Sequence, residues 1–147
     1  MPVTPEQTAA LRALLVDDMD THHAVYTRLG AAKAGYIALV TAAFCEAAER
    51  RFGARHDVAD VADVAAFVAD VRSRSDRLAG EVDPLIAERV ISAVFGDGSL
   101  GDLSDAAVAG TQIVLLGALV ADEHYDDTGL DAFLASSGRL ADQLMRA

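Results

Sequence analysis

The feature that most constrains the fold is one long apolar segment at residues 104–123. In its middle only Thr111 and Gln112 interrupt a run of aliphatic and small side chains. A helix that is apolar nearly all round belongs in a protein core or in a membrane. The run is short for a membrane span, which needs roughly 20 apolar residues, and acidic residues bracket it. We therefore predict a buried central helix over about residues 104–122, and no membrane span.

The other apolar segments also have helical spacing. Thr4 can cap a helix that opens at Pro5, and Gln7 stands where the partner in a capping box belongs. Apolar residues then recur at helical intervals in 21–52, 57–77, 83–95 and 130–145, and no segment alternates like an exposed strand. The sequence predicts an all-α fold, with residues 1–147 forming a single-domain bundle of five or six helices around the central one.

Glycine and proline predict where helices are interrupted. One unbroken helix over 21–52 would be roughly 50 Å long, so we predict a break between Gly30 and Gly35. Asp20 or Thr21 is expected to cap the helix before the break, and Gly53 is expected to end the helix that follows it. Asp83 is expected to cap a helix that Pro84 opens, and 96–101 is expected to be a loop.

The composition is strongly acidic, with a net charge of −11 over 147 residues. This charge argues against binding to nucleic-acid backbones, which requires a cationic surface. It suits a basic protein partner, although solubility alone explains it as well. The start of the chain lacks the pattern of a signal peptide, so we expect a cytoplasmic protein. The lone cysteine, Cys45, is expected to be buried and unreactive.

Two acid–histidine clusters are candidate metal sites, since carboxylates and imidazoles are metal ligands. Asp20 and His23 also have the i, i+3 spacing that places two ligands on one helical face. The candidate ligands are Asp17, Asp20, His22 and His23 in residues 17–23, and Glu123, His124 and Asp126 in residues 122–127. We prefer a structural interpretation, in which the acids cap helices or interact favourably with helix dipoles.

Two groups of arginines raise the alternative of an anion site. They are Arg50, Arg51 and Arg55, and then Arg72, Arg74 and Arg77. Each group falls near a predicted helix C-terminus, where cations complement the helix dipole, and this is the interpretation we prefer. The chain contains no motif of a P-loop, of a GxSxG hydrolase or of an HExxH metalloprotease. The sequence therefore names no catalytic residue and no cofactor.

These features favour a non-enzymatic protein-interaction or regulatory module, with self-association as a homodimer as one form of that interaction. One alternative is a metal-binding helical enzyme that uses the clusters at 17–23 and 122–127. The other is a binder of a small apolar ligand between helices, where such pockets commonly lie.

Overall fold

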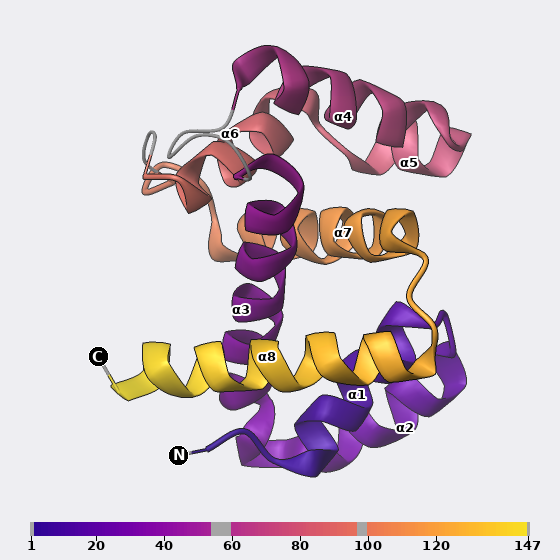
Figure 1. The fold of residues 1–147 in the computed structure, drawn as a ribbon, viewed down its shortest axis with the longest axis vertical. Helices are drawn as coiled ribbons and strands as arrows, with labels where there is room; N and C mark the ends of the chain where they lie inside the picture. Colours follow the sequence, from indigo (N-terminus) through magenta and orange to yellow (C-terminus); the bar gives the residue numbers. More distant parts are fainter. Residues whose placement is uncertain (1, 54–59, 97–99, 147) are drawn as a thin grey trace. The chain divides into compact units, whose positions relative to one another are not determined.

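The computed structural model describes residues 2–53, 60–96 and 100–146. All regular structure in these ranges is helical, which confirms the predicted all-α class (Figure 1). The elements are α1 (Pro5–Leu15), α2 (Met19–Leu29), the 3-10 helix η1 (Gly30–Ala32), α3 (Lys33–Phe52), α4 (Val61–Ser73), α5 (Asp76–Glu81), α6 (Pro84–Val94), α7 (Asp105–Glu123) and α8 (Asp127–Arg146). The helices in these ranges outnumber the five or six predicted, because two predicted helical stretches are each divided.

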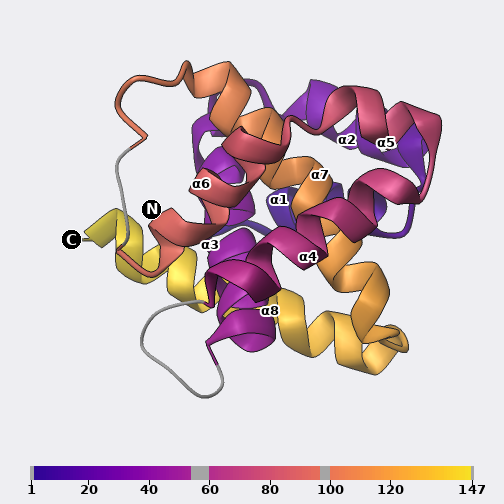
Figure 2. The same cartoon turned by 90° about the horizontal axis from the view of Figure 1, so that it is seen from above.

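The chain forms two compact units, which are described separately. Unit 1 comprises residues 1–46 and 120–147, and unit 2 comprises residues 47–119. The boundaries fall inside α3 and α7, so each of these helices contributes to both units. In unit 1, α1 packs against α2 and α8. In unit 2, α4 packs against α5 and α6, and Figure 2 shows α4 and α6 side by side. The expectation of a single domain stays a prediction.

A capping box begins α1, as predicted. The backbone N–H of Gln7 donates to Thr4 Oγ1, and the backbone N–H of Thr4 donates to Gln7 Oε1. The side chain of Gln7 is buried, and its Nε2 donates to the carbonyl oxygen of Ala32 at 2.9 Å. One buried side chain therefore both caps α1 and ties it to η1.

The predicted break between Gly30 and Gly35 is confirmed. Gly30 has a φ of +53°, a left-handed value that only glycine adopts at little cost. The 3-10 turn η1 then leads into α3 at Lys33. The helix α3 ends at Phe52, immediately before Gly53, as the sequence predicts.

The start of α2 differs from the sequence expectation. Asp20 and Thr21 are the caps that the sequence favours, but the helix begins at Met19 with Asp18 as its cap. The reason is that Asp18 Oδ1 accepts a hydrogen bond from the backbone N–H of Thr21 at 3.2 Å. Hydrogen bonds from the side chain and the backbone of Thr21 also lower the pKa of Asp18.

The stretch predicted as one helix over 57–77 is divided in unit 2. The helix α4 ends at Ser73, and Ser75 caps the short α5 by accepting a hydrogen bond from the backbone N–H of Leu78 at 3.0 Å. The apolar spacing predicts one continuous helix here, but the capping hydrogen bond of Ser75 starts a new helix instead. Residues 57–59 of the predicted helix lie outside the described residues.

A half-buried carboxylate joins α3 and α8 within unit 1. Glu46 accepts hydrogen bonds from the hydroxyls of Ser136 and Ser137, which are neighbours on α8. Ser137 is fully buried, so its hydroxyl depends on Glu46. A polar contact inside the unit therefore fixes the register between the two helices.

The predicted central helix is present as α7. Ser104 caps it by accepting a hydrogen bond from the backbone N–H of Ala107. Burial is concentrated in the C-terminal half, where the buried side chains are Leu115, Leu116, Leu119 and Val120. The first half, by contrast, is exposed or half-buried.

Two helical stretches, Met19–Phe52 and Asp105–Glu123, are long and apolar enough to cross a membrane by length and composition alone. The core helices of soluble proteins meet the same criteria. The first stretch also contains the break at Gly30.

Candidate interaction surface

The residues of the first acid–histidine cluster lie around the start of α2. Asp17, Asp20 and His23 are exposed, and His22 is half-buried. The Nδ1 of His22 lies 3.0 Å from the carbonyl oxygen of Ala10. Because a carbonyl oxygen only accepts hydrogen bonds, Nδ1 carries the proton in this contact. One imidazole nitrogen of the cluster is therefore already used to join α2 to α1.

An aromatic group surrounds the other side of His22. Its ring stacks on Tyr26, with centroids 5.8 Å apart, and Tyr36 meets Tyr26 edge-on at 5.6 Å. The Lys33 ammonium lies 4.9 Å from the centroid of the Tyr26 ring, a cation–π distance. Burial, and to a lesser extent Tyr26, raises the pKa of Tyr36 to about 12. His22 thus packs among aromatic rings within unit 1.

The second cluster lies between α7 and α8. Glu123 and His124 are exposed, and His124 has a φ of +53° where the chain turns. Asp126 caps α8, since its Oδ1 accepts a hydrogen bond from the backbone N–H of Gly129 at 2.7 Å. The structural interpretation of the acids in this turn therefore holds for Asp126.

In the ranges that the structure describes, no three or more His, Cys, Asp or Glu side chains are placed to hold a metal ion together. The two clusters supply no joint ligand set there. Cys45 is half-buried, whereas the sequence predicts burial.

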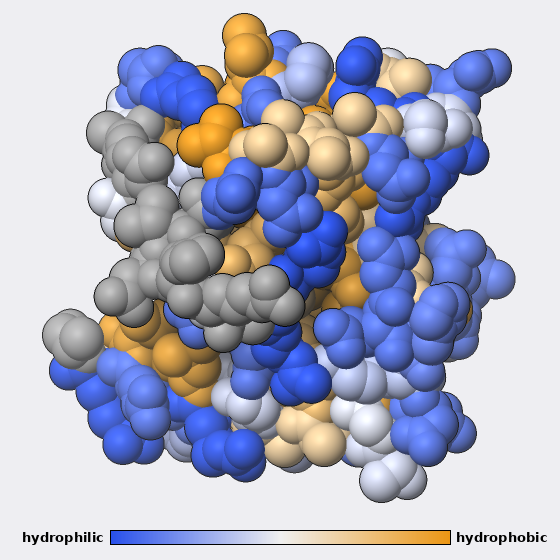
Figure 3. Space-filling model, turned by 45° about the horizontal axis from the view of Figure 1, so that its top comes forward, coloured by the Kyte–Doolittle hydropathy of each residue, from blue (hydrophilic) through white to orange (hydrophobic). Residues whose placement is uncertain are grey.

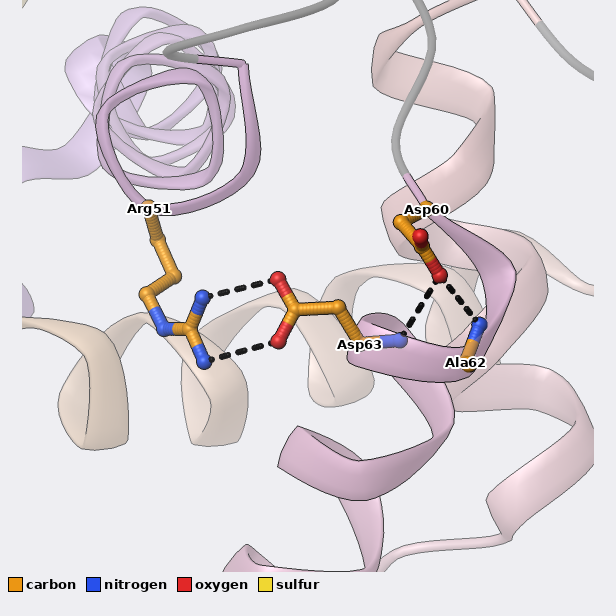
Figure 4. Close-up of polar contacts among 4 residues, drawn as sticks. All are labelled: Arg51, Asp60, Ala62 and Asp63. Atoms are coloured by element: carbon orange, nitrogen blue, oxygen red, sulfur yellow. Dashed lines mark hydrogen bonds and ion pairs between the residues drawn. The ribbon is translucent and has the colours of Figure 1, made fainter.

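The arginines that suggested an anion site bind groups within their own unit. Arg51 forms two hydrogen bonds to Asp63, at 3.0 and 3.2 Å, and Asp60 beside it caps α4 (Figure 4). Arg72 donates to the carbonyl oxygens of Val82 and Ala79, close to the end of α5. These contacts favour the interpretation that the two arginines stabilise their own unit.

Two further arginines of the second group also pair with acids of unit 2. Arg74 pairs with Asp70 and Arg77 with Glu81, both across one helical turn. Both pairs have the i, i+4 spacing at which side chains on one helix meet. Arg55 and the neighbouring His56 lie outside the described residues.

Unit 1 has a groove between the start of α1 and α8, with a volume of about 430 Å³. Small side chains make up much of its wall, and Arg12 pairs with Asp127 and Asp131 at one side. The lining includes Thr8, Ala9, Leu134, Ala135, Gly138 and Arg139. A Cβ built on Gly138 would meet nothing within 4 Å, so the groove is open at this point.

Unit 2 has a second groove, between α4 and α6, with a volume of about 390 Å³. Its lining residues are Val61 and Val64 from α4, and Leu85, Glu88, Arg89 and Ser92 from α6. Val61 and Leu85 are each 71% exposed, which makes them the most exposed large hydrophobic residues in the described ranges. Figure 3 shows how hydrophobic residues reach the surface among hydrophilic ones.

Sequence reasoning missed these two residues for different reasons. Val61 belongs to the apolar face predicted for its helix, but it is the first residue of α4 and is not buried with Val64, Phe67 and Val68. Leu85 is exposed because it lies off the buried stripe of α6, which is formed by Ala87, Val90 and Ile91. An apolar residue in the first turn and off the buried stripe is the sequence signal that could have identified it.

No protein-family model matches the chain, and no match is found among curated proteins or solved structures. What the protein binds must therefore be inferred from its own residues.

Proposed function

We propose that the protein is a non-enzymatic interaction module that binds a partner protein at the groove between α4 and α6. The observation that carries the proposal is the exposure of Val61 and Leu85, 71% each, on the walls of one groove. Apolar side chains exposed together and rimmed by polar residues mark interaction sites and binding grooves. A cytoplasmic location, as expected from the sequence, belongs to the same proposal.

Capture of partners from the native host tests the proposal with matched variants. The variant V61S/L85S removes the apolar walls, and Ile37→Ser removes a residue that is 55% exposed on α3 instead. Wild type and Ile37→Ser should retain the same partner, and V61S/L85S should lose it while keeping its melting temperature. If V61S/L85S captures the same proteins in the same amounts, the groove is not the binding surface.

Self-association is the form of the proposal in which the partner is a second copy of the chain. It predicts a sedimentation coefficient that rises with protein concentration for wild type and Ile37→Ser, but not for V61S/L85S. A concentration-independent monomer in all three proteins would exclude the homodimer and leave only a different partner.

The groove between α1 and α8 favours a second candidate function, the binding of a small apolar ligand. Its volume of about 430 Å³ lies within the range of ligand pockets. Gly138→Leu would fill the open space beside Gly138. If wild type carries apolar material through purification and Gly138→Leu does not, this candidate is supported. If native mass spectra show no bound apolar molecule in either wild type or Gly138→Leu, the ligand-binding candidate is not supported.

The metal-enzyme alternative has its own test. Replacing His22, His23 and His124 together by Ala should abolish any metal-linked stability, because a bound ion stabilises the folded state by mass action. A wild type whose melting temperature falls with a chelator, beside an insensitive triple variant, would favour the metal site over the interaction module.

A further inference from the structure

The groove between α4 and α6 has the form that receives one side of a helix. The α6 residues that line it, Leu85, Glu88, Arg89 and Ser92, recur at i, i+3, i+4 and i+7, so they share one face of the helix. Val61 and Val64 line it from α4. An amphipathic helix binds in such a groove by inserting apolar side chains with the same spacing.

The arginines near the groove are already paired with acids. Arg89 forms hydrogen bonds to both carboxylate oxygens of Asp102. Arg51, close to the start of α4, binds both oxygens of Asp63 in the same way (Figure 4). Each positive charge is therefore balanced by a carboxylate within unit 2.

One carboxylate lines the groove, and two more precede the helices that form it. Glu88 lines the groove and forms no ion pair among the described residues. Asp60 and Asp83, next to the first turns of α4 and α6, each accept backbone N–H bonds through Oδ1 alone. Lys33, the only lysine of the chain, belongs to unit 1.

We propose that this groove binds the apolar face of a basic amphipathic helix from a partner protein, an inference that rests on the proposed function. The apolar face would cover Val61 and Leu85, and flanking Lys or Arg side chains would approach Glu88. A second copy of the chain fits less well, because it brings the same Glu88 and a net charge of −11. Opposite charge across the rim favours both the rate and the selectivity of binding.

Peptide binding to the full-length protein tests the partner's chemistry. The probe is a fluorescent helical peptide of Leu and Lys, with Leu at i, i+3, i+4 and i+7. A control peptide carries Gln in place of Lys. Fluorescence anisotropy gives both affinities for wild type, Leu85→Ser, Glu88→Gln and Ile37→Ser, each with its melting temperature checked.

We expect the Leu/Lys peptide to bind wild type and Ile37→Ser equally. Leu85→Ser should weaken binding by about tenfold, as expected when one anchoring side chain loses its apolar contact. Glu88→Gln should weaken it by a smaller factor, and that factor should shrink as salt screens the charges. The Leu/Gln peptide should bind more weakly than the Leu/Lys peptide.

The opposite outcomes separate this inference from the proposed function. If the Leu/Gln peptide binds as well as the Leu/Lys peptide and Leu85→Ser weakens both, the groove is an interaction site, but its partner is not basic. If the Leu/Lys peptide binds all four proteins equally, or binds none, the inference is overturned while partner capture still decides the proposed function. If Leu85→Cys in a Cys45→Ala background resists a thiol reagent in the folded protein, the groove is covered and both fail.

Discussion

The side chain of Gln7 lies so close to Gly35 that no side-chain atom fits between them. A Cβ built on Gly35 would lie 2.4 Å from the Nε2 of Gln7. The same nitrogen donates a hydrogen bond to the carbonyl oxygen of Ala32 at 2.9 Å. A side chain at position 35 would displace the buried Gln7 amide, so the glycine leaves room for the capping-box partner of α1 beside the start of α3.

Replacing Gln7 by Ala should destabilise the protein by about 1–2 kcal/mol, since it removes half of a capping box and leaves the Ala32 carbonyl without its donor. The measurement is the urea midpoint of unfolding. Gln143→Ala, an exposed change on α8, is the control and should stay within about 0.5 kcal/mol of wild type. Equal effects of the two changes would show that the Gln7 contacts contribute nothing to stability.

Gly35→Ala should destabilise by roughly 1–3 kcal/mol, because the added methyl group overlaps the Gln7 amide. Gly138→Ala, where a Cβ meets nothing, should instead stabilise by about 0.5–1 kcal/mol through helix propensity. If overlap with the Gln7 amide causes the loss of stability in Gly35→Ala, then Gln7→Ala should remove that overlap. The double variant Q7A/G35A should then be more stable than the sum of the single effects by more than about 0.5 kcal/mol. Strict additivity would disprove the contact.

Local chemistry made part of the fold predictable. The capping box of Thr4 and Gln7 and the cap at Asp83 involve residues that are close in the sequence, so their signals can be read there directly. The break near Gly30 follows from one backbone angle that other residues avoid. The all-α class followed because these short-range signals agreed along the whole chain.

Contacts between distant residues were not predictable in the same way. The approach of Gln7 to Gly35 joins residues on different helices, and no local pattern marks it. The same holds for Glu46 with Ser136. The groove of unit 2 could not be predicted in this way. Helical spacing shows which residues share a face of a helix, but not which of them other helices bury. Val61 shares a face with the buried Val64, yet it is exposed at the first position of α4.

Leu116→Asp should prevent soluble folding. Leu116 is fully buried on α7, and an unpaired buried carboxylate costs several kcal/mol against a total stability of about 5–15 kcal/mol. Leu85→Asp is the matched control, because Leu85 is exposed in the first turn of α6, where an acid interacts favourably with the helix dipole. The yield of soluble protein and its helical dichroism decide the comparison. A soluble Leu116→Asp protein with the melting temperature of wild type would show that α7 is not part of a core.

Glu46→Ala should cost about 1–3 kcal/mol, since it leaves the buried hydroxyl of Ser137 without an acceptor. Glu49→Ala changes an exposed glutamate on the same helix and should be nearly neutral. The triple variant E46A/S136A/S137A removes the donors as well and should recover part of the loss. Thermal melts of the three variants test this order. If the triple variant is no more stable than Glu46→Ala, the unsatisfied hydroxyl is not the cause of the loss.

The pair of Arg89 and Asp102 should make a measurable part of the stability depend on acid pH. The side-chain hydrogen bond from Arg89, followed by a backbone hydrogen bond, lowers the pKa of Asp102 below its ordinary value of 3.8. A carboxyl group with a lower pKa in the folded state contributes stability above its unfolded pKa, and that contribution is lost as the pH falls through the folded pKa. Wild type should therefore lose more stability than Asp102→Asn when the pH is lowered from neutral to below 3.8.

The measurement is the difference in urea midpoint between wild type and Asp102→Asn across this pH range. Both partners are largely exposed, so the effect should be small and should shrink with added salt. Arg89→Gln should produce the same loss of pH dependence, and combining it with Asp102→Asn should add nothing further. Asp20→Asn, an exposed change with no ion pair among the described residues, is the control. A pH dependence that is equal in wild type and Asp102→Asn would show that the ion pair does not stabilise the folded protein.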